Sequence, residues 1–118
     1  MAQPPATIIE QLPDAVVVHV QHSDMSEEHI TSVQADITKA GTEQSVPVIL
    51  DIAKVKYIPS LALGLFVRMA NTFRAKQQRF ILASPQPTVR QVLAITRLDR
   101  AMEIQETVES ALKAIRPA

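Results

Sequence analysis

The chain has 118 residues, 47% of them hydrophobic, with 12 Lys plus Arg against 12 Asp plus Glu and no cysteine. Its length fits one compact domain, and its apolar content excludes a disordered segment. Zero formal charge, with one tyrosine, three phenylalanines and no tryptophan, excludes the basic surface and the stacking platforms of general nucleic-acid binding. We expect a single domain over residues 1–118, with its core over about 7–115 between short frayed termini.

The N-terminal segment and the cysteine count bear on the cellular setting. Residues 1–10 lack the basic start and the long apolar stretch of a signal peptide. No segment approaches the roughly 18 uninterrupted apolar residues that a membrane-spanning helix needs. The absence of cysteine excludes a disulfide framework and a thiolate nucleophile. We therefore expect a cytoplasmic protein that does not insert into a membrane.

Hydrophobic periodicity predicts strands that alternate with helices in the order ββαβαβαβα. The expected strands lie at residues 7–9, 15–20, 46–52, 79–83 and 102–104. The expected helices begin after Asp24 or Ser26, at Ser60, at Thr88 and near Val108, and the first two end at Gly41 and Gln77. The first two strands flank the turn-forming pair Pro13-Asp14 and predict a hairpin, whereas the later alternation predicts an α/β sheet with parallel crossovers. The residues that we expect to be buried against this sheet are Ile30, Val33, Ile37, Leu63, Phe66, Ala70, Val92 and Leu93.

The sequence contains little that could carry catalysis. Its three histidines, His19, His22 and His29, have no metal-ligand spacing, so we expect them to face solvent or to be hydrogen-bonded. Gly41 and Gly64 are the only glycines, which excludes a glycine-rich phosphate or dinucleotide loop. No serine stands in a nucleophile-elbow context. We therefore predict no catalytic residue, cofactor or metal ion, and an unrecognised enzyme site is the weakest alternative.

The informative stretch leads from Asp51, at the end of a strand, through Pro59 to the helix that starts at Ser60. A serine at a helix start fits a helix cap, because its hydroxyl can accept a bond from an early backbone N–H. The alternative is that the hydroxyl is a modification site. A phosphoryl group would add about −1.5 to −2 charges, which the positive end of a helix accommodates.

The same helix is apolar over well over half of its circumference, more than one contact with a core requires. Its central apolar residues are Leu63, Phe66, Ala70 and Phe73. Leu61 and Leu65 lie on a flank that turns toward Arg68. Two explanations stay open, deep burial between the sheet and other helices, or a protein-docking surface formed by Leu61, Gly64, Leu65 and Arg68. An interior glycine costs about 1 kcal/mol against alanine, and its missing Cβ would let a partner's backbone approach.

At these residues the chain resembles the STAS domains of bacterial anti-sigma-factor antagonists. Their pattern is an apolar strand that ends in Asp-Leu, a short loop, and Asp-Ser-Ser/Thr-Gly-Leu-Gly at a helix start. Residues 48–52 (Val-Ile-Leu-Asp-Ile) match the strand, and residues 59–64 (Pro-Ser-Leu-Ala-Leu-Gly) fall on the helix motif. Residues 89–100 are similar to the family's third helix and its Leu-Asp exit. The resemblance spans residues 15–115.

The resemblance implies a mixed sheet with helices packed mainly on one face, and a regulator of transcription that is not an enzyme. In this family the unphosphorylated form binds an anti-sigma factor, usually a Ser/Thr kinase, and so frees the sigma factor. Phosphorylation of the motif serine breaks that complex, and a phosphatase restores it. Ser60 falls on the motif serine, with Asp51 and Pro59 in its environment. We expect the anti-sigma kinase and the phosphatase to be its partners. We expect the chain itself to be a monomer or a weak dimer.

The chain departs from the family pattern at the helix motif. Pro59 stands where the family has Asp, Leu61 where it has a second hydroxyl residue, and Ala62 where it has Gly. The fold inference rests on the apolar pattern and does not depend on these positions, whereas recognition of the loop by a kinase does. The alternative function is a docking subunit of a larger signalling scaffold or lipid-transporter assembly, without regulated phosphorylation.

Overall fold

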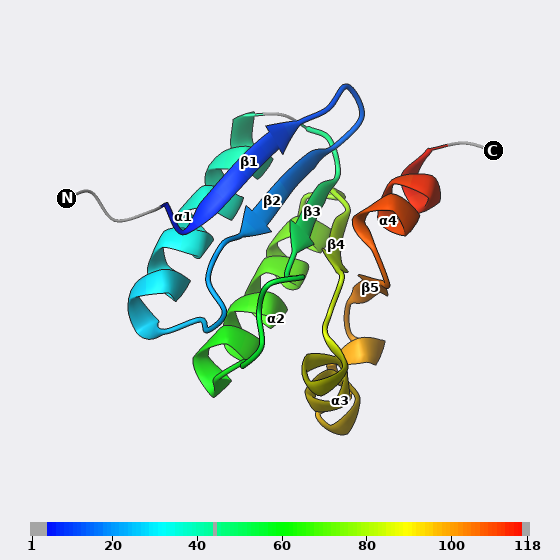
Figure 1. Cartoon of the computed structure of the whole chain (residues 1–118). Helices are drawn as coiled ribbons and strands as arrows, with labels where there is room; N and C mark the ends of the chain where they lie inside the picture. Colours follow the sequence, from blue (N-terminus) through cyan, green and yellow to red (C-terminus); the bar gives the residue numbers. More distant parts are fainter. Residues whose placement is uncertain (1–4, 44, 117–118) are drawn as a thin grey trace.

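The computed structural model describes residues 5–43 and 45–116 and is built on one five-stranded sheet (Figure 1). The strands β1 (Thr7–Gln11), β2 (Val16–Val20), β3 (Val48–Asp51), β4 (Phe80–Ala83) and β5 (Glu103–Gln105) lie side by side in chain order. β1 and β2 are antiparallel, and all later neighbours are parallel. The helices are α1 (Glu27–Glu43), α2 (Ser60–Ala75), α3 (Pro87–Ile95) and α4 (Val108–Ile115), with a 3-10 helix η1 (Leu98–Arg100) before β5. The predicted α/β order and the mixed sheet are confirmed.

The two faces of the sheet carry two separate apolar cores, because successive side chains of a strand point to opposite faces. On one face Val18, Leu50 and Leu82 pack with apolar residues of α1, α2 and α3. On the other face Ile49 and Ile81 pack with Ala111 of α4. Figure 1 shows α1 and α2 side by side along the sheet. The helices therefore lie mainly on one face, as predicted, and α4 alone covers part of the other.

The predicted core is confirmed at most positions and corrected at one residue each of α2 and α3. Ile30, Val33, Ile37, Phe66, Ala70 and Leu93 are buried, whereas Leu63 and Val92 are half-buried. On α2 the buried arc keeps the predicted Phe66, Ala70 and Phe73 and extends to Ala62, Leu65 and Met69. The arc is both wide and displaced because α2 packs against α1 as well as against the sheet. The explanation by deep burial therefore accounts for most of the apolar surface of this helix.

Gly41 does not end the first helix, as the sequence predicts, but lies within α1, which continues to Glu43. Its role is packing. A Cβ on Gly41 would stand 2.3 Å from Cε1 of Phe73, a fully buried ring of α2. The missing side chain therefore sets how closely α1 and α2 approach.

We expect Gly41→Ala to destabilise the protein by about 1–3 kcal/mol, because the new methyl group meets a buried aromatic ring that cannot move aside freely. Gly64→Ala is the matched control on α2. Its Cβ would meet only the Arg68 guanidinium at 3.7 Å, and the gain in helix propensity should stabilise the protein by up to about 1 kcal/mol. Urea unfolding of both variants measures the difference, and equal effects would contradict this account of Gly41.

Candidate functional site

The loop between β3 and α2 is held in place by bonds at several points along its length. The N–H groups of Lys56 and Tyr57 both donate to the carbonyl oxygen of Ser23, at 2.7 and 3.3 Å. Gln86, at the start of α3, donates to the carbonyl of Ala53 at 2.8 Å. The side chains of Val55 and Ile58 are buried in the core. The start of α2 is therefore presented by a loop with fixed ends and fixed contacts.

Ser60 is the first residue of α2 and is exposed. Pro59 occupies the cap position, and its carbonyl accepts the N–H groups of Ala62 and Leu63 at 3.0 and 3.2 Å. No side chain makes a capping hydrogen bond at this helix start. The hydroxyl of Ser60 is thus not the helix cap that its residue type suggests. It lies beside the N–H groups of the first turn, the positive end of the helix.

The surface beside Ser60 combines apolar side chains with a cation, and we call Tyr57, Leu61, Gly64 and Arg68 the docking patch. Tyr57 and Leu61 are 65% and 58% exposed, values that are high for side chains of this size. Gly64 is half-buried, and the exposed Arg68 donates to Gln34 of α1 at 3.3 Å. Sequence reasoning did not assign Tyr57, although an aromatic residue just before the helix motif was a signal for it.

Leu65 is the one predicted docking residue that the structure excludes. Its side chain is 0% exposed and belongs to the core under α2, so no partner can contact it in this conformation. The helical wheel places Leu65 only one turn from Leu61, which is why both were assigned to the same flank. The boundary of the core falls between them.

Asp51 points away from α2 and into a cluster that spans three strands. Leu50 faces the core under α2, so the next residue of the strand faces the opposite side of the sheet. There the Asp51 carboxylate lies 2.6 Å from Nδ1 of His19 and accepts the N–H of Ala53 at 3.0 Å. Nε2 of His19 in turn lies 3.0 Å from the Glu10 carboxylate. The sequence-based prediction that Asp51 belongs to the environment of Ser60 is therefore wrong, because its carboxylate lies on the opposite face of the sheet.

The electrostatics of this cluster favour the imidazolium form of His19. Partial burial of the ring by itself would lower its pKa. The hydrogen bonds to Glu10 and Asp51, with the attraction of their charges, outweigh the burial and raise the pKa of His19 above its usual value of 6.5. The prediction that the histidines are hydrogen-bonded or face solvent is confirmed for His19. The sequence could not identify its partners, because they depend on the strand register.

The other two histidines stack on each other at the start of α1. The rings of His22 and His29 are 3.7 Å apart and inclined by 10°. Nδ1 of His29 lies 3.4 Å from Oδ1 of Asp24 and makes no hydrogen bond. Among the described residues no group of three or more His, Cys, Asp or Glu side chains could hold a metal ion.

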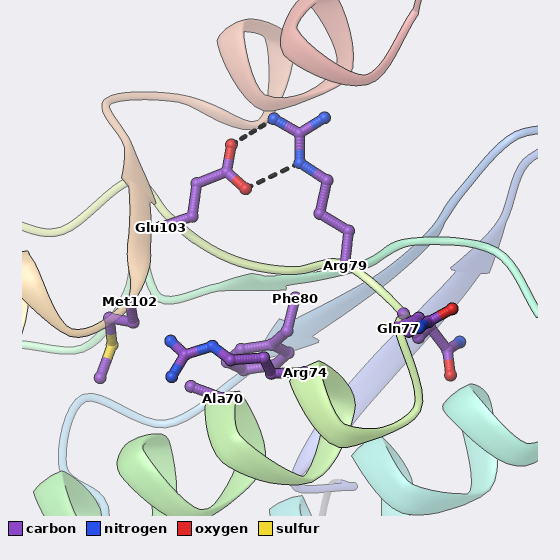
Figure 2. A pocket seen from close by; sticks show the side chains of 8 residues that line it. Ala70, Arg74, Gln77, Arg79, Phe80, Met102 and Glu103 are labelled. Atoms are coloured by element: carbon purple, nitrogen blue, oxygen red, sulfur yellow. Dashed lines mark hydrogen bonds and ion pairs between the residues drawn. The ribbon is translucent and has the colours of Figure 1, made fainter.

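A hollow of about 330 Å³ lies at the opposite end of α2, between its last turn and the starts of β4 and β5 (Figure 2). The Arg79 guanidinium and the Glu103 carboxylate face each other at its rim, and Nε donates at 2.7 Å. Arg74 donates to the carbonyl of Ala101 at 2.8 Å. Both guanidinium groups already donate hydrogen bonds within the chain. Neither therefore offers an unpaired positive charge to a ligand in this hollow. It is also a helix length, about 24 Å, from Ser60.

Within residues 5–43 and 45–116, no helix has the length and apolar character needed to cross a membrane.

Comparison with known proteins shows the family of the chain. A family model described as the STAS domain matches residues 6–111. A putative anti-sigma factor antagonist of Thermotoga maritima is 32% identical over 69 residues, which cover 58% of this chain and 61% of that protein. The chain thus spans about three fifths of the length of the curated relatives that it matches.

Solved structures share the fold over nearly the whole chain. An anti-sigma factor antagonist from Mycobacterium paratuberculosis superimposes with a TM-score of 0.83 at 20% identity, covering 99% of this chain and 100% of that one. The antagonist SpoIIAA in its unphosphorylated form is 25% identical with a TM-score of 0.77, covering 94% and 96%. The phosphorylated form of SpoIIAA from Bacillus is 24% identical with a TM-score of 0.71, covering 94% and 100%.

We expect His19 to make the stability of the protein depend on pH near neutrality. A histidine whose pKa is higher in the folded state stabilises fully below its usual pKa of 6.5, and this contribution is lost as the pH rises through the raised value. The difference in unfolding free energy between wild type and His19→Gln should therefore be larger at pH 5.5 than at pH 8.5. Urea unfolding at both pH values measures it, with His22→Gln as the control. A difference that does not change with pH would contradict the geometry of the cluster.

Proposed function

Because the chain belongs to the STAS domain family, we propose that it is an anti-sigma-factor antagonist that works by partner switching. In its unphosphorylated form it binds an anti-sigma factor that is a Ser/Thr kinase and so frees a sigma factor. Phosphorylation of Ser60 releases the complex, and a phosphatase restores it. On this proposal the protein acts in the cytoplasm, as a binding protein without an enzymatic activity of its own.

The observation that carries the proposal is the exposed residue Ser60 on the first turn of α2, directly beside the exposed side chain of Leu61. A kinase needs access to the hydroxyl, and Ser60 is exposed where the loop meets the helix. The hydroxyl makes no capping bond, so its modification breaks no contact that holds the helix start. Of the relatives, SpoIIAA exists in phosphorylated and unphosphorylated forms, which is consistent with such a switch.

The physical basis of the switch is a difference in solvation between the free and the bound protein. In the free protein a phosphoryl dianion on Ser60 faces water and the positive end of α2. In a complex, a partner that closes over Leu61 and Tyr57 removes water from the same dianion. An unpaired buried charge is costly, so the complex dissociates while the fold remains.

The departures from the family motif limit which kinase can act. Pro59 fixes the backbone before Ser60 and supplies no negative charge, and Leu61 offers no second hydroxyl. A cognate kinase must therefore recognise an apolar, proline-led loop. We expect its contact surface to be apolar with an acidic group opposite Arg68.

The switch is tested by comparing wild type, Ser60→Ala and Ser60→Asp. The partner is first identified by pull-down from the native host with mass spectrometry, in which an anti-sigma kinase supports the proposal. We then expect equal melting temperatures for the three proteins and at least a tenfold weaker affinity for Ser60→Asp, about 1.4 kcal/mol. Equal binding by all three would remove the switch and favour a docking subunit of a larger assembly.

The extent of the docking patch is tested by a matched pair of leucines on α2. Leu61→Ala should leave the unfolding free energy within about 0.5 kcal/mol of wild type, because the side chain is exposed, and should weaken partner binding by more than about 1 kcal/mol. Leu65→Ala should cost about 2–5 kcal/mol of stability, because it opens a cavity in the core. Titration calorimetry and urea unfolding separate the two effects. Undiminished binding by Leu61→Ala would remove this residue from the patch.

A further inference from the structure

The two edges of the sheet differ in how they are protected. β5 is short, half-buried and polar, and its Glu103 is paired with Arg79, features that discourage pairing with another strand. β1 is the other edge and pairs only with β2 among the described strands. It contains no proline, no lysine and no bulge, and its Ile8 and Ile9 are 52% and 39% exposed. An edge of this kind is a template for a further strand.

The strand register shows which backbone groups of β1 point to the free edge. The N–H of Gln21 donates to Ala6 at 2.9 Å, and the N–H of Leu12 donates to Ala15 at 2.8 Å. Residues of an antiparallel pair alternate between hydrogen-bonded and non-hydrogen-bonded positions, so Ile8 and Glu10 also bond to β2. The N–H and C=O groups of Thr7, Ile9 and Gln11 therefore point outward.

We propose that β1 pairs antiparallel with β1 of a second copy of this chain, with Ile9 on the twofold axis. In that register Ile9 lies opposite Ile9 of the other copy, and Thr7 lies opposite Gln11. All three outward-facing residues then meet outward-facing residues, whereas a shift by two positions leaves part of this set unpaired. The strand is complementary to itself, which is the requirement of a twofold interface.

The side chains fit the same register. Ile9 packs against its symmetry mate on the side of the sheet that carries α1, which removes both side chains from water. On the other side Ile8 lies opposite Glu10 of the second copy, and the carboxylate of Glu10 is already held by His19 at 3.0 Å. The Ile8 side chain can therefore lie along the aliphatic part of Glu10 without competing for its charge. The result is one continuous sheet through two chains.

The interface is small, because a single five-residue strand on each side forms its centre. Interfaces well below about 1,200 Å² are characteristic of weak and transient complexes, so the dimer forms reversibly with concentration. The edge lies on the first strand, whereas the docking patch lies on α2 and the loop before it. Dimer formation is thus independent of the proposed switch at Ser60.

The first test follows the mass and the amide exchange of the full chain as its concentration rises from about 5 μM to 1 mM, a range suited to a weak complex. Analytical ultracentrifugation should show a shift from one chain to two. Hydrogen exchange by NMR should show the amides of Thr7, Ile9 and Gln11 becoming protected with concentration. The amides of Ile8 and Glu10, bonded to β2 in either state, serve as internal controls and should not change.

The second test uses two exposed isoleucines with the same substitution. Ile9→Lys places like charges opposite each other at the axis and should raise the dissociation constant at least tenfold. Ile95→Lys, on α3 at a side chain that is 72% exposed, should leave it unchanged. Thermal melts of dilute samples show that both variants are folded. A chain that stays monomeric at 1 mM, or a dimer that forms without protection of the Ile9 amide or unaffected by Ile9→Lys, would overturn the proposal.

Discussion

The burial of β3 on both faces is the constraint on which the rest of the structure depends. Val48, Ile49 and Leu50 are fully buried, with α2 on one side of the sheet and α4 on the other. A strand in this position must be apolar at every residue and hydrogen-bonded along both edges. Polar side chains can appear only where the strand ends. Asp51 and the loop to Ser60 follow from this rule, because they occupy the carboxyl end of β3.

The carboxyl end of the sheet separates two surfaces with different chemistry. The docking patch on α2 and the loop before it is apolar with one cation, and it lies beside the hydroxyl of Ser60, which makes no capping bond. The Glu10–His19–Asp51 cluster lies on the opposite face, is hydrogen-bonded throughout, and links β1, β2 and β3. The proposed phosphorylation of Ser60 would therefore alter one surface without disturbing the strand pairing that the other supports. This separation matters in a small domain, because its free energy of unfolding is small and the loss of a few contacts can unfold it.

Tight contact between α1 and α2 accounts for the places where sequence reasoning went wrong on α2. The close approach at Gly41 and Phe73 brings α1 against the flank of α2, which buries Leu65 and leaves Leu63 at the rim of the core. Helical periodicity alone centres the buried arc on the most apolar stripe and cannot tell how many neighbours cover it. The glycine that looked like a helix end was in fact the condition for that second neighbour. At Gly41, local propensity predicts a helix end, whereas tertiary packing requires a glycine inside the helix.

The sequence by itself determined the order of the elements and the mixed sheet, because alternating and helical spacings of apolar residues are local properties of the chain. The family followed from a resemblance of short motifs, above all at residues 48–52 and 59–64. The sequence also determined that a serine opens α2. Only the tertiary structure decided what surrounds that serine. The side on which Asp51 points depends on strand alternation, the partners of His19 depend on the register of β1 and β3, and the exposure of Leu61 against Leu65 depends on how closely α1 approaches. Each of these is a contact between residues far apart in the chain, and no local pattern contains it.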